Sequence, residues 1–156
     1  AYPSRIWING QEVTQQIRTP EVTQQVSAIA AQPMVRQGLL QQQQQYGVNG
    51  GVVMEGRDIG TAVFPHAELK IFLTASVTER ARRRQRDMEA QHQPVASLAD
   101  LERAIDERDR KDSSRQVAPL KKAADALELN TDGLTIDEVV SKIICLFENR
   151  GASKEA

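Results

Sequence analysis

The sequence has a single cysteine and no long apolar run. Cys145 stands alone among 156 residues, which excludes an intrachain disulfide framework and a cysteine-ligated zinc cluster. No run approaches 18 apolar residues and no signal-peptide pattern opens the chain, so neither a membrane span nor a secretory leader is predicted. A reducing cytoplasm is the expected compartment.

The sequence also has almost no net charge. Twenty Lys and Arg side chains balance 21 Asp and Glu, leaving −1, so no nucleic-acid polymer is expected as a partner. Arginine outnumbers lysine 14 to 6, which suits a bidentate grip on phosphate or carboxylate but is also common on helix surfaces. A hydrophobic fraction of 40% predicts a folded domain with a core.

The apolar pattern predicts an α/β chain with a parallel sheet. A hairpin is expected around Asn9-Gly10, followed by two helices that begin at Pro20 and Pro33. Ligands of a parallel sheet bind beyond the carboxyl ends of its strands, so the residues after each strand matter most. The expected strands are 51–56, 69–73 and, more weakly, 126–129, and capping patterns predict helices from Ser76, Ser97 and Thr135.

The segment after the first expected strand concentrates charge between glycines. Glu55, Arg57 and Asp58 lie between Gly56 and Gly60 or next to them, where a ligand can approach the backbone. An acid at this position can orient a Mg²⁺-bound water and the arginine can hold a phosphate. An ordinary polar turn with a local salt bridge explains the same residues equally well.

Two further arginine groups lie on expected helices. Arg80, Arg83 and Arg84 share one face of a helix with few apolar residues, which is either a solvated charged face or a mobile lid over polyphosphate. Arg108, Asp112 and Arg115 also share one face, as an ion-pair ladder or as a hydroxyl acceptor between two phosphate grips. His66 and His92 lack metal-ligand spacing, and Cys145 is interpreted as packing filler.

Several motifs in fixed order resemble those of bacterial-type cytidylate kinase. They are Val52–Thr61, Phe64–Ala67, Lys70–Ser76 with Glu79 and Arg80, Glu107–Arg115 and Ala118–Leu127, preceded by Ile17–Val22, Ser27 and Pro33–Arg36. The resemblance implies a P-loop NTPase-like three-layer parallel sheet with an incomplete core, a small α+β nucleoside-monophosphate-binding insert and a helical lid. It assigns the insert to 1–48, core strands and a loop to 49–79, the arginine-rich lid and following helix to 80–115, and the C-terminal core strand and helix to 116–156.

The resemblance further implies phosphoryl transfer from ATP to CMP or dCMP with Mg²⁺, giving CDP or dCDP. At matching positions, Ser27, Arg36 and Asp58 resemble the contacts to the cytosine base. Arg57 and Arg108 resemble grips on the acceptor phosphate. The physics fits, because phosphoryl transfer depends on positioning and charge neutralisation.

The remaining roles follow from the same resemblance. Asp112 resembles the acceptor for the sugar hydroxyls, and Arg115 resembles a neighbouring contact to the nucleotide. Glu55 stands where an outer-shell acid near Mg²⁺ is frequent. The residues expected to serve catalysis are Arg57, Asp58, Arg108 and Arg115, and those expected in the lid that closes on ATP are Arg80, Arg83 and Arg84.

One departure from the family concerns the donor site. The family's G-x-x-x-x-G-K-[ST] loop cradles ATP phosphates, and no Gly-Lys pair occurs in these 156 residues. The chain is therefore expected to be the C-terminal two-thirds of a kinase, inactive and prone to self-association by itself, whereas the intact enzyme is expected to be a monomer. The alternatives are a non-catalytic CMP-binding module or an interaction module, and a fused enzyme domain upstream is a further expectation.

Overall fold

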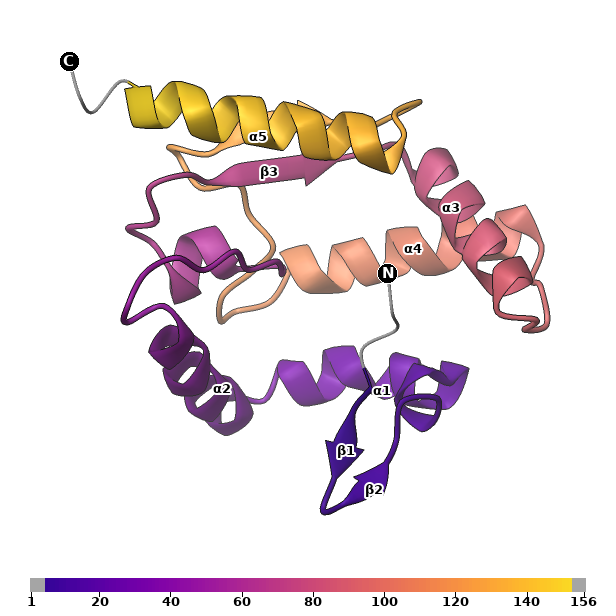
Figure 1. Cartoon of the computed structure of the whole chain (residues 1–156). Coiled ribbons are helices and arrows are strands. Elements are labelled where there is room, and N and C mark those ends of the chain that lie inside the picture. The colour runs from indigo at the N-terminus through magenta and orange to yellow at the C-terminus, as the bar shows by residue number, and fades with distance from the viewer. Residues whose placement is uncertain (1–4, 153–156) are drawn as a thin grey trace. The chain divides into compact units, whose positions relative to one another are not determined.

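The computed structural model describes residues 5–152, which form two compact units that divide between Gly51 and Val52 (Figure 1). Each unit is described by itself. Within residues 5–152, no helix is both long and apolar enough to cross a bilayer.

The first unit opens with the predicted hairpin. Strands β1 (Trp7–Ile8) and β2 (Gln11–Glu12) pair antiparallel. Both turn residues have positive φ, 50° at Asn9 and 80° at Gly10, as the Asn-Gly pair predicts for this type of turn. The 3₁₀ turn η1 (Gln16–Arg18) follows, and then helices α1 (Pro20–Ala30) and α2 (Pro33–Tyr46) begin at the two prolines that predict them.

The second unit is α/β, as predicted. Strands β3 (Ile71–Thr74) and β4 (Leu127–Asn130) pair in parallel, with Ile71 opposite Leu127. Helix α5 (Ile136–Ala152) runs along this small sheet (Figure 1). Helices α3 (Val77–Ala90) and α4 (Leu98–Ser113) connect the strands, and a π-helical turn, η2 (Ile59–Val63), precedes them.

The predicted strand over 51–56 is wrong. This segment is irregular, and the side chain of Val53 is 100% exposed. A strand needs a neighbour to satisfy its backbone N–H and C=O groups, and β3 pairs with β4 instead. No strand within residues 5–152 pairs with 51–56, so Val52 and Val53 stay at the surface.

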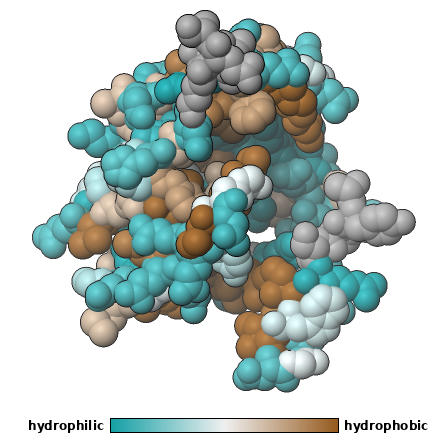
Figure 2. All heavy atoms as spheres, turned by 60° about the vertical axis from the view of Figure 1, so that its left-hand side comes forward, coloured by the Kyte–Doolittle hydropathy of each residue, from teal (hydrophilic) through white to brown (hydrophobic). Residues whose placement is uncertain are grey.

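The apolar stripe of α5 is only partly covered. Val139 and Ile143 are half-buried, whereas Ile136, Ile144 and Phe147 are exposed. Figure 2 shows apolar side chains at the molecular surface in several places. Burying such side chains is the main driving force of folding, so much of the apolar content of this chain contributes little to its core.

The α3–α4 hairpin is well capped and buries an apolar side chain on each helix. Ser76 Oγ accepts from Glu79 N at 3.2 Å, and Ser97 Oγ accepts from Asp100 N at 3.1 Å, so both predicted helix starts are confirmed. Ala81 of α3 is fully buried, and Leu101 of α4 is 9% exposed. The hairpin thereby gives α3 more anchorage than its low apolar content predicts.

Candidate functional site

Asp112 is the centre of a charged cluster at the C-terminal end of α4. Its side chain is 1% exposed, and its Oδ1 accepts a hydrogen bond from Arg115 Nη2. Its Oδ2 is also buried but receives no hydrogen bond within the described residues. A buried carboxylate oxygen without a donor is costly, which makes this atom a natural acceptor for a ligand hydroxyl.

Two more guanidinium groups approach the same oxygen. Arg57 Nε lies 3.3 Å from Asp112 Oδ2, and Arg108 Nε lies 3.8 Å from it. Arg57 comes from the irregular segment before η2, and Arg108 comes from α4 one turn before Asp112. The predicted ladder on α4 is therefore present, and the fold adds Arg57 to it from a distant part of the sequence.

The three arginines differ in what remains available to a ligand. The Arg115 side chain is 10% exposed and is committed to Asp112. Arg57 and Arg108 are 36% and 47% exposed, and within residues 5–152 their guanidinium groups form ion pairs but no hydrogen bond. Their N–H groups can therefore donate to an anion from solvent, as a phosphate grip requires.

Asp109, one turn before Asp112 on α4, brings a fourth arginine to the cluster. Its Oδ2 accepts from Arg80 Nη1 at 2.5 Å, and its Oδ1 lies 3.7 Å from Arg57 Nη1. Arg80 belongs to α3 and was predicted to act with ATP rather than beside Arg57. Asp109 is the residue of this cluster to which the sequence pattern assigns no role.

The cluster carries more positive than negative charge. Four guanidinium groups surround two carboxylates, those of Asp109 and Asp112. Burial and then the neighbouring Arg108 lower the pKa of Arg57, while Asp109 opposes this effect. The positive charge of Arg108 thus opposes that of Arg57, and an anionic ligand between them would offset this repulsion.

A buried lysine, Lys70, supports the turn that follows Arg57 and Asp58. Lys70 Nζ donates to the Pro65 carbonyl at 2.5 Å and to both carboxylate oxygens of Asp125, at 2.9 and 2.8 Å. Its aliphatic stem lies against Gly60, where a Cβ would come within 3.3 Å of Lys70 Cδ. Lys70 therefore ties η2 to the segment before β4.

Asp58 begins the π-helical turn. Its carbonyl oxygen accepts from the backbone N–H groups of Thr61, Ala62 and Val63, at 3.3, 2.8 and 3.3 Å. The Asp58 side chain is half-buried. This turn fixes the backbone immediately after Arg57. The side chains of Arg57 and Asp58 therefore both extend from a constrained segment.

The other arginines of α3 are separated by the fold. Arg83 donates to Thr131 at the end of β4, from Nη1 to Oγ1 at 3.0 Å and from Nη2 to the carbonyl at 2.5 Å. Arg84 is exposed, and its side chain forms no ion pair or hydrogen bond within the described part of the chain. The predicted common face is therefore divided between Arg80 in the cluster, Arg83 at the sheet and Arg84 in solvent.

The remaining predicted site residues lie elsewhere. Arg36 belongs to the first unit, where Nη1 donates to the Ala30 carbonyl at 3.2 Å. Ser27 lies in α1 of that unit, but its side chain is outside the described residues. Glu55 is exposed, and no group of three or more His, Cys, Asp or Glu side chains within residues 5–152 could hold a metal ion.

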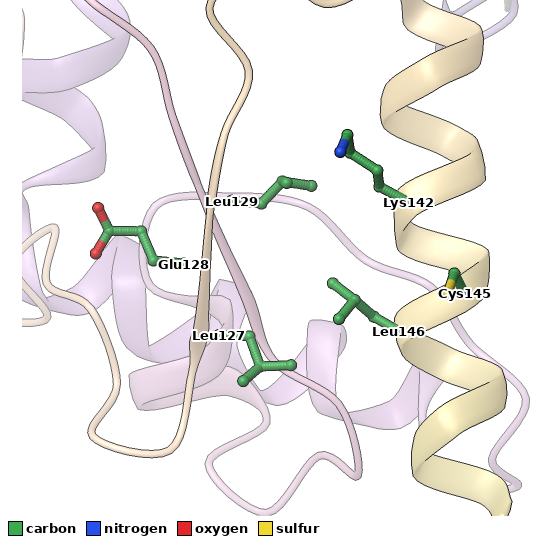
Figure 3. A pocket seen from close by; sticks show the side chains of 6 residues that line it. All are labelled: Leu127, Glu128, Leu129, Lys142, Cys145 and Leu146. Atoms are coloured by element: carbon green, nitrogen blue, oxygen red, sulfur yellow. The ribbon is translucent and has the colours of Figure 1, made fainter.

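An apolar groove between β4 and α5 lies apart from these residues. Figure 3 shows Leu127, Leu129 and Leu146 between the strand and the helix, while Glu128 points to the other side of the strand. None of the predicted site residues lines the groove. Cys145 is one of its lining residues and is exposed, so it fills less of the core than its interpretation as packing filler implies.

Comparison with known proteins gives a consistent family. The family model for cytidylate kinase matches residues 2–149. A bifunctional pantoate ligase/cytidylate kinase from a Nostoc species is 64% identical over 148 residues, which cover 95% of this chain and 28% of the relative. Proteins of the same name from Acaryochloris marina and a Synechocystis species are 58% and 61% identical, covering 94% and 92% of this chain and 28% of each relative. The chain thus spans less than a third of the length of these relatives.

Proposed function

Because the chain belongs to the cytidylate kinase family, we propose that it forms the acceptor part of an enzyme that transfers a phosphoryl group from ATP to CMP or dCMP. The observation that carries the proposal is the convergence of Arg57 and Arg108 on the buried Oδ2 of Asp112, which accepts no hydrogen bond within the described residues. A nucleoside monophosphate offers the two complementary groups, a phosphate for the guanidiniums and sugar hydroxyls for the carboxylate.

In this proposal the arginines act by position and charge. Arg57 and Arg108 hold the acceptor phosphate and neutralise the charge that builds up during transfer, while Asp112 accepts the sugar hydroxyls. Arg115 orients Asp112 through the hydrogen bond to Oδ1. Asp58 contributes to recognition of the cytosine base, and the first unit, which carries Ser27 and Arg36, acts as the monophosphate-binding insert.

The donor side of the proposal involves the α3 arginines and Mg²⁺. Arg83 and Arg84 belong to a lid that meets ATP, and the fold is P-loop NTPase-like. Mg²⁺ usually binds through one or two carboxylates plus substrate phosphates, which agrees with an isolated acid such as Glu55 acting through water. When bound, the ion supplies charge neutralisation at the transferring phosphates.

The ATP phosphates require residues other than these 156, because they contain no Gly-Lys pair for a phosphate loop. We therefore propose that the isolated 156-residue chain does not turn over. In an ADP-release assay, the full-length natural protein should consume ATP when CMP is added, and the isolated chain should not. CMP-dependent turnover by the isolated chain would overturn this part of the proposal.

Binding distinguishes the kinase from the alternative of a module with another role. Titration calorimetry on the full-length protein should show CMP binding more tightly than AMP, because cytosine is read by specific contacts. Equal affinity for the two nucleotides would contradict cytosine recognition. CMP binding without any phosphoryl transfer would favour the non-catalytic binding module.

A further inference from the structure

The carboxylate of Asp109 is shared between two arginines from different parts of the chain. Oδ2 accepts from Arg80 Nη1 at 2.5 Å, and Oδ1 lies 3.7 Å from Arg57 Nη1. The Asp109 side chain is 25% exposed, so water screens these contacts only in part. One carboxylate therefore connects α3 with the segment that precedes η2.

Arg80 is itself anchored, which gives Asp109 a fixed direction. Arg80 Nε donates to the carbonyl of Ala75, the residue directly after β3, at 3.2 Å. The guanidinium is planar, so two bonds at different nitrogens define its orientation. The end of β3 thus fixes the orientation of the Arg80 guanidinium, which in turn fixes the orientation of the Asp109 carboxylate.

Arg57 depends on carboxylates for its own orientation. Asp112 lies 3.3 Å from Nε and Asp109 lies 3.7 Å from Nη1, and no hydrogen bond within residues 5–152 holds this guanidinium. Two anions at two different nitrogens fix the plane of the group while leaving its N–H donors for a ligand. Without Asp109, only Asp112 would remain to orient it.

We propose that Asp109 is a positioning residue, which holds the guanidinium of Arg57 in the orientation that meets the acceptor phosphate. This inference rests on the proposed function, and it names a residue to which that function assigns no task. Asp109 does not touch the substrate, and it acts through Arg57. Its neutralisation should therefore change how well the phosphate is aligned, which can cost about 100-fold in rate for a displacement of about 1 Å.

The sign of the effect separates positioning from simple charge. Asp109→Asn removes a negative charge from an already positive cluster, and by charge alone this would attract a phosphate more strongly. A positioning role instead predicts a slower chemical step without weaker binding. The two roles therefore differ in whether kcat falls while KM for CMP stays the same.

The experiment measures kcat and KM for CMP in the full-length natural protein at saturating ATP. We expect Asp109→Asn to lower kcat by about 10- to 100-fold while KM changes by less than about threefold. The matched control is Asp106→Asn, which neutralises a carboxylate three residues earlier on α4 whose one ion pair within residues 5–152 is with the exposed Arg110. Asp106→Asn should leave both constants within about twofold of the wild type.

A second variant keeps the inference testable if Asp109→Asn affects folding. Arg80→Gln releases the other side of the shared carboxylate and should show the same fall in kcat at saturating ATP. The double variant should be no slower than the slower single variant, because both act through the same contact.

Different outcomes would overturn the inference and the proposed function on which it rests. An active wild type in which Asp109→Asn behaves like Asp106→Asn would overturn the inference alone, as would a rise in KM with kcat unchanged. A full-length wild type that does not phosphorylate CMP would overturn the proposed function and the inference with it.

Discussion

Arg115 donates a hydrogen bond to Asp112 Oδ1 from a side chain that is only 10% exposed, so this ion pair lies inside the protein. Arg57 and Arg108 approach the other oxygen of the same carboxylate from the solvent side. The buried pair serves the architecture of the site, while the two exposed guanidiniums are available for a ligand. Loss of Arg115 should therefore mainly lower stability, whereas loss of Arg57 or Arg108 should mainly lower activity.

Arg115→Ala should destabilise the protein. Removing one partner of a buried ion pair leaves a carboxylate without compensation, at a cost of about 3 kcal/mol. Urea unfolding followed by circular dichroism measures this change. The control is Arg110→Ala, whose guanidinium is exposed and pairs with Asp106 at the surface, and a change below about 0.5 kcal/mol is expected there. Equal effects of the two variants would mean that the Arg115–Asp112 pair is not buried in solution.

Stability should depend on pH through Asp125. The hydrogen bond from Lys70 lowers the pKa of the Asp125 carboxyl below its ordinary 3.8. Because the folded-state pKa is lowered, the stabilisation is complete above the unfolded-state pKa of about 3.9 and is lost as the pH falls through the folded-state value.

Comparison of Asp125→Asn with the wild type measures this contribution. Urea unfolding between pH 7 and pH 3 should show a stability gap that is constant down to about pH 5 and shrinks below about pH 4. Asp87→Asn, at an exposed carboxylate without an ion pair in the described residues, is the control. A gap for Asp125→Asn that does not change with pH would contradict the Lys70–Asp125 contact.

Alanine at Gly60 should lower CMP turnover, whereas alanine at Gly38 should raise stability. A Cβ at Gly60 would come within 3.3 Å of the Lys70 stem, so Gly60→Ala should disturb the turn that follows Arg57 and Asp58 and lower CMP turnover. Gly38 lies inside α2 with open space around it, so Gly38→Ala should raise stability by about 0.5 to 1 kcal/mol. Thermal unfolding and the ADP-release assay test both variants, and a fully active Gly60→Ala protein would show that Lys70 yields without moving the turn.

Local features of the fold were predictable because their causes are local. The turn at Asn9-Gly10 follows from the two residues that adopt positive φ most readily. The capping box at Thr135 also forms as expected: Glu138 Oε2 accepts from Thr135 N at 2.8 Å, and Thr135 Oγ1 accepts from Glu138 N at 3.3 Å. Each of these depends on residues at most three positions apart.

The irregular structure of 51–56 could not be predicted from its apolar residues. A strand is stabilised by a neighbour, and the neighbour of a parallel strand comes from a distant part of the chain. The run has the composition of a strand, yet no described residues pair with it, so Val53 remains fully exposed. Composition gives the tendency of a segment, whereas pairing decides its structure.

The charged cluster was predictable in part. Helix geometry places Arg108 beside Asp112 on α4, and this contact is present. The arrival of Arg57 and Arg80 depends on tertiary packing, which spacing along the chain does not give. Asp109 had a local signal, since it lies three residues before Asp112 and next to Arg108, but an acid within a run of alternating charges does not stand out.

The most direct test of the proposed acceptor site is the CMP-dependent release of ADP by the full-length natural protein and its Arg57→Ala and Arg108→Ala variants. Each variant should lose at least about 100-fold in CMP phosphorylation, because each removes a positioned charge from the transferring group. Their unfolding free energies should stay within about 1 kcal/mol of the wild type, since both side chains are partly exposed. A loss below threefold in both variants would contradict the assignment of the acceptor phosphate to these two arginines.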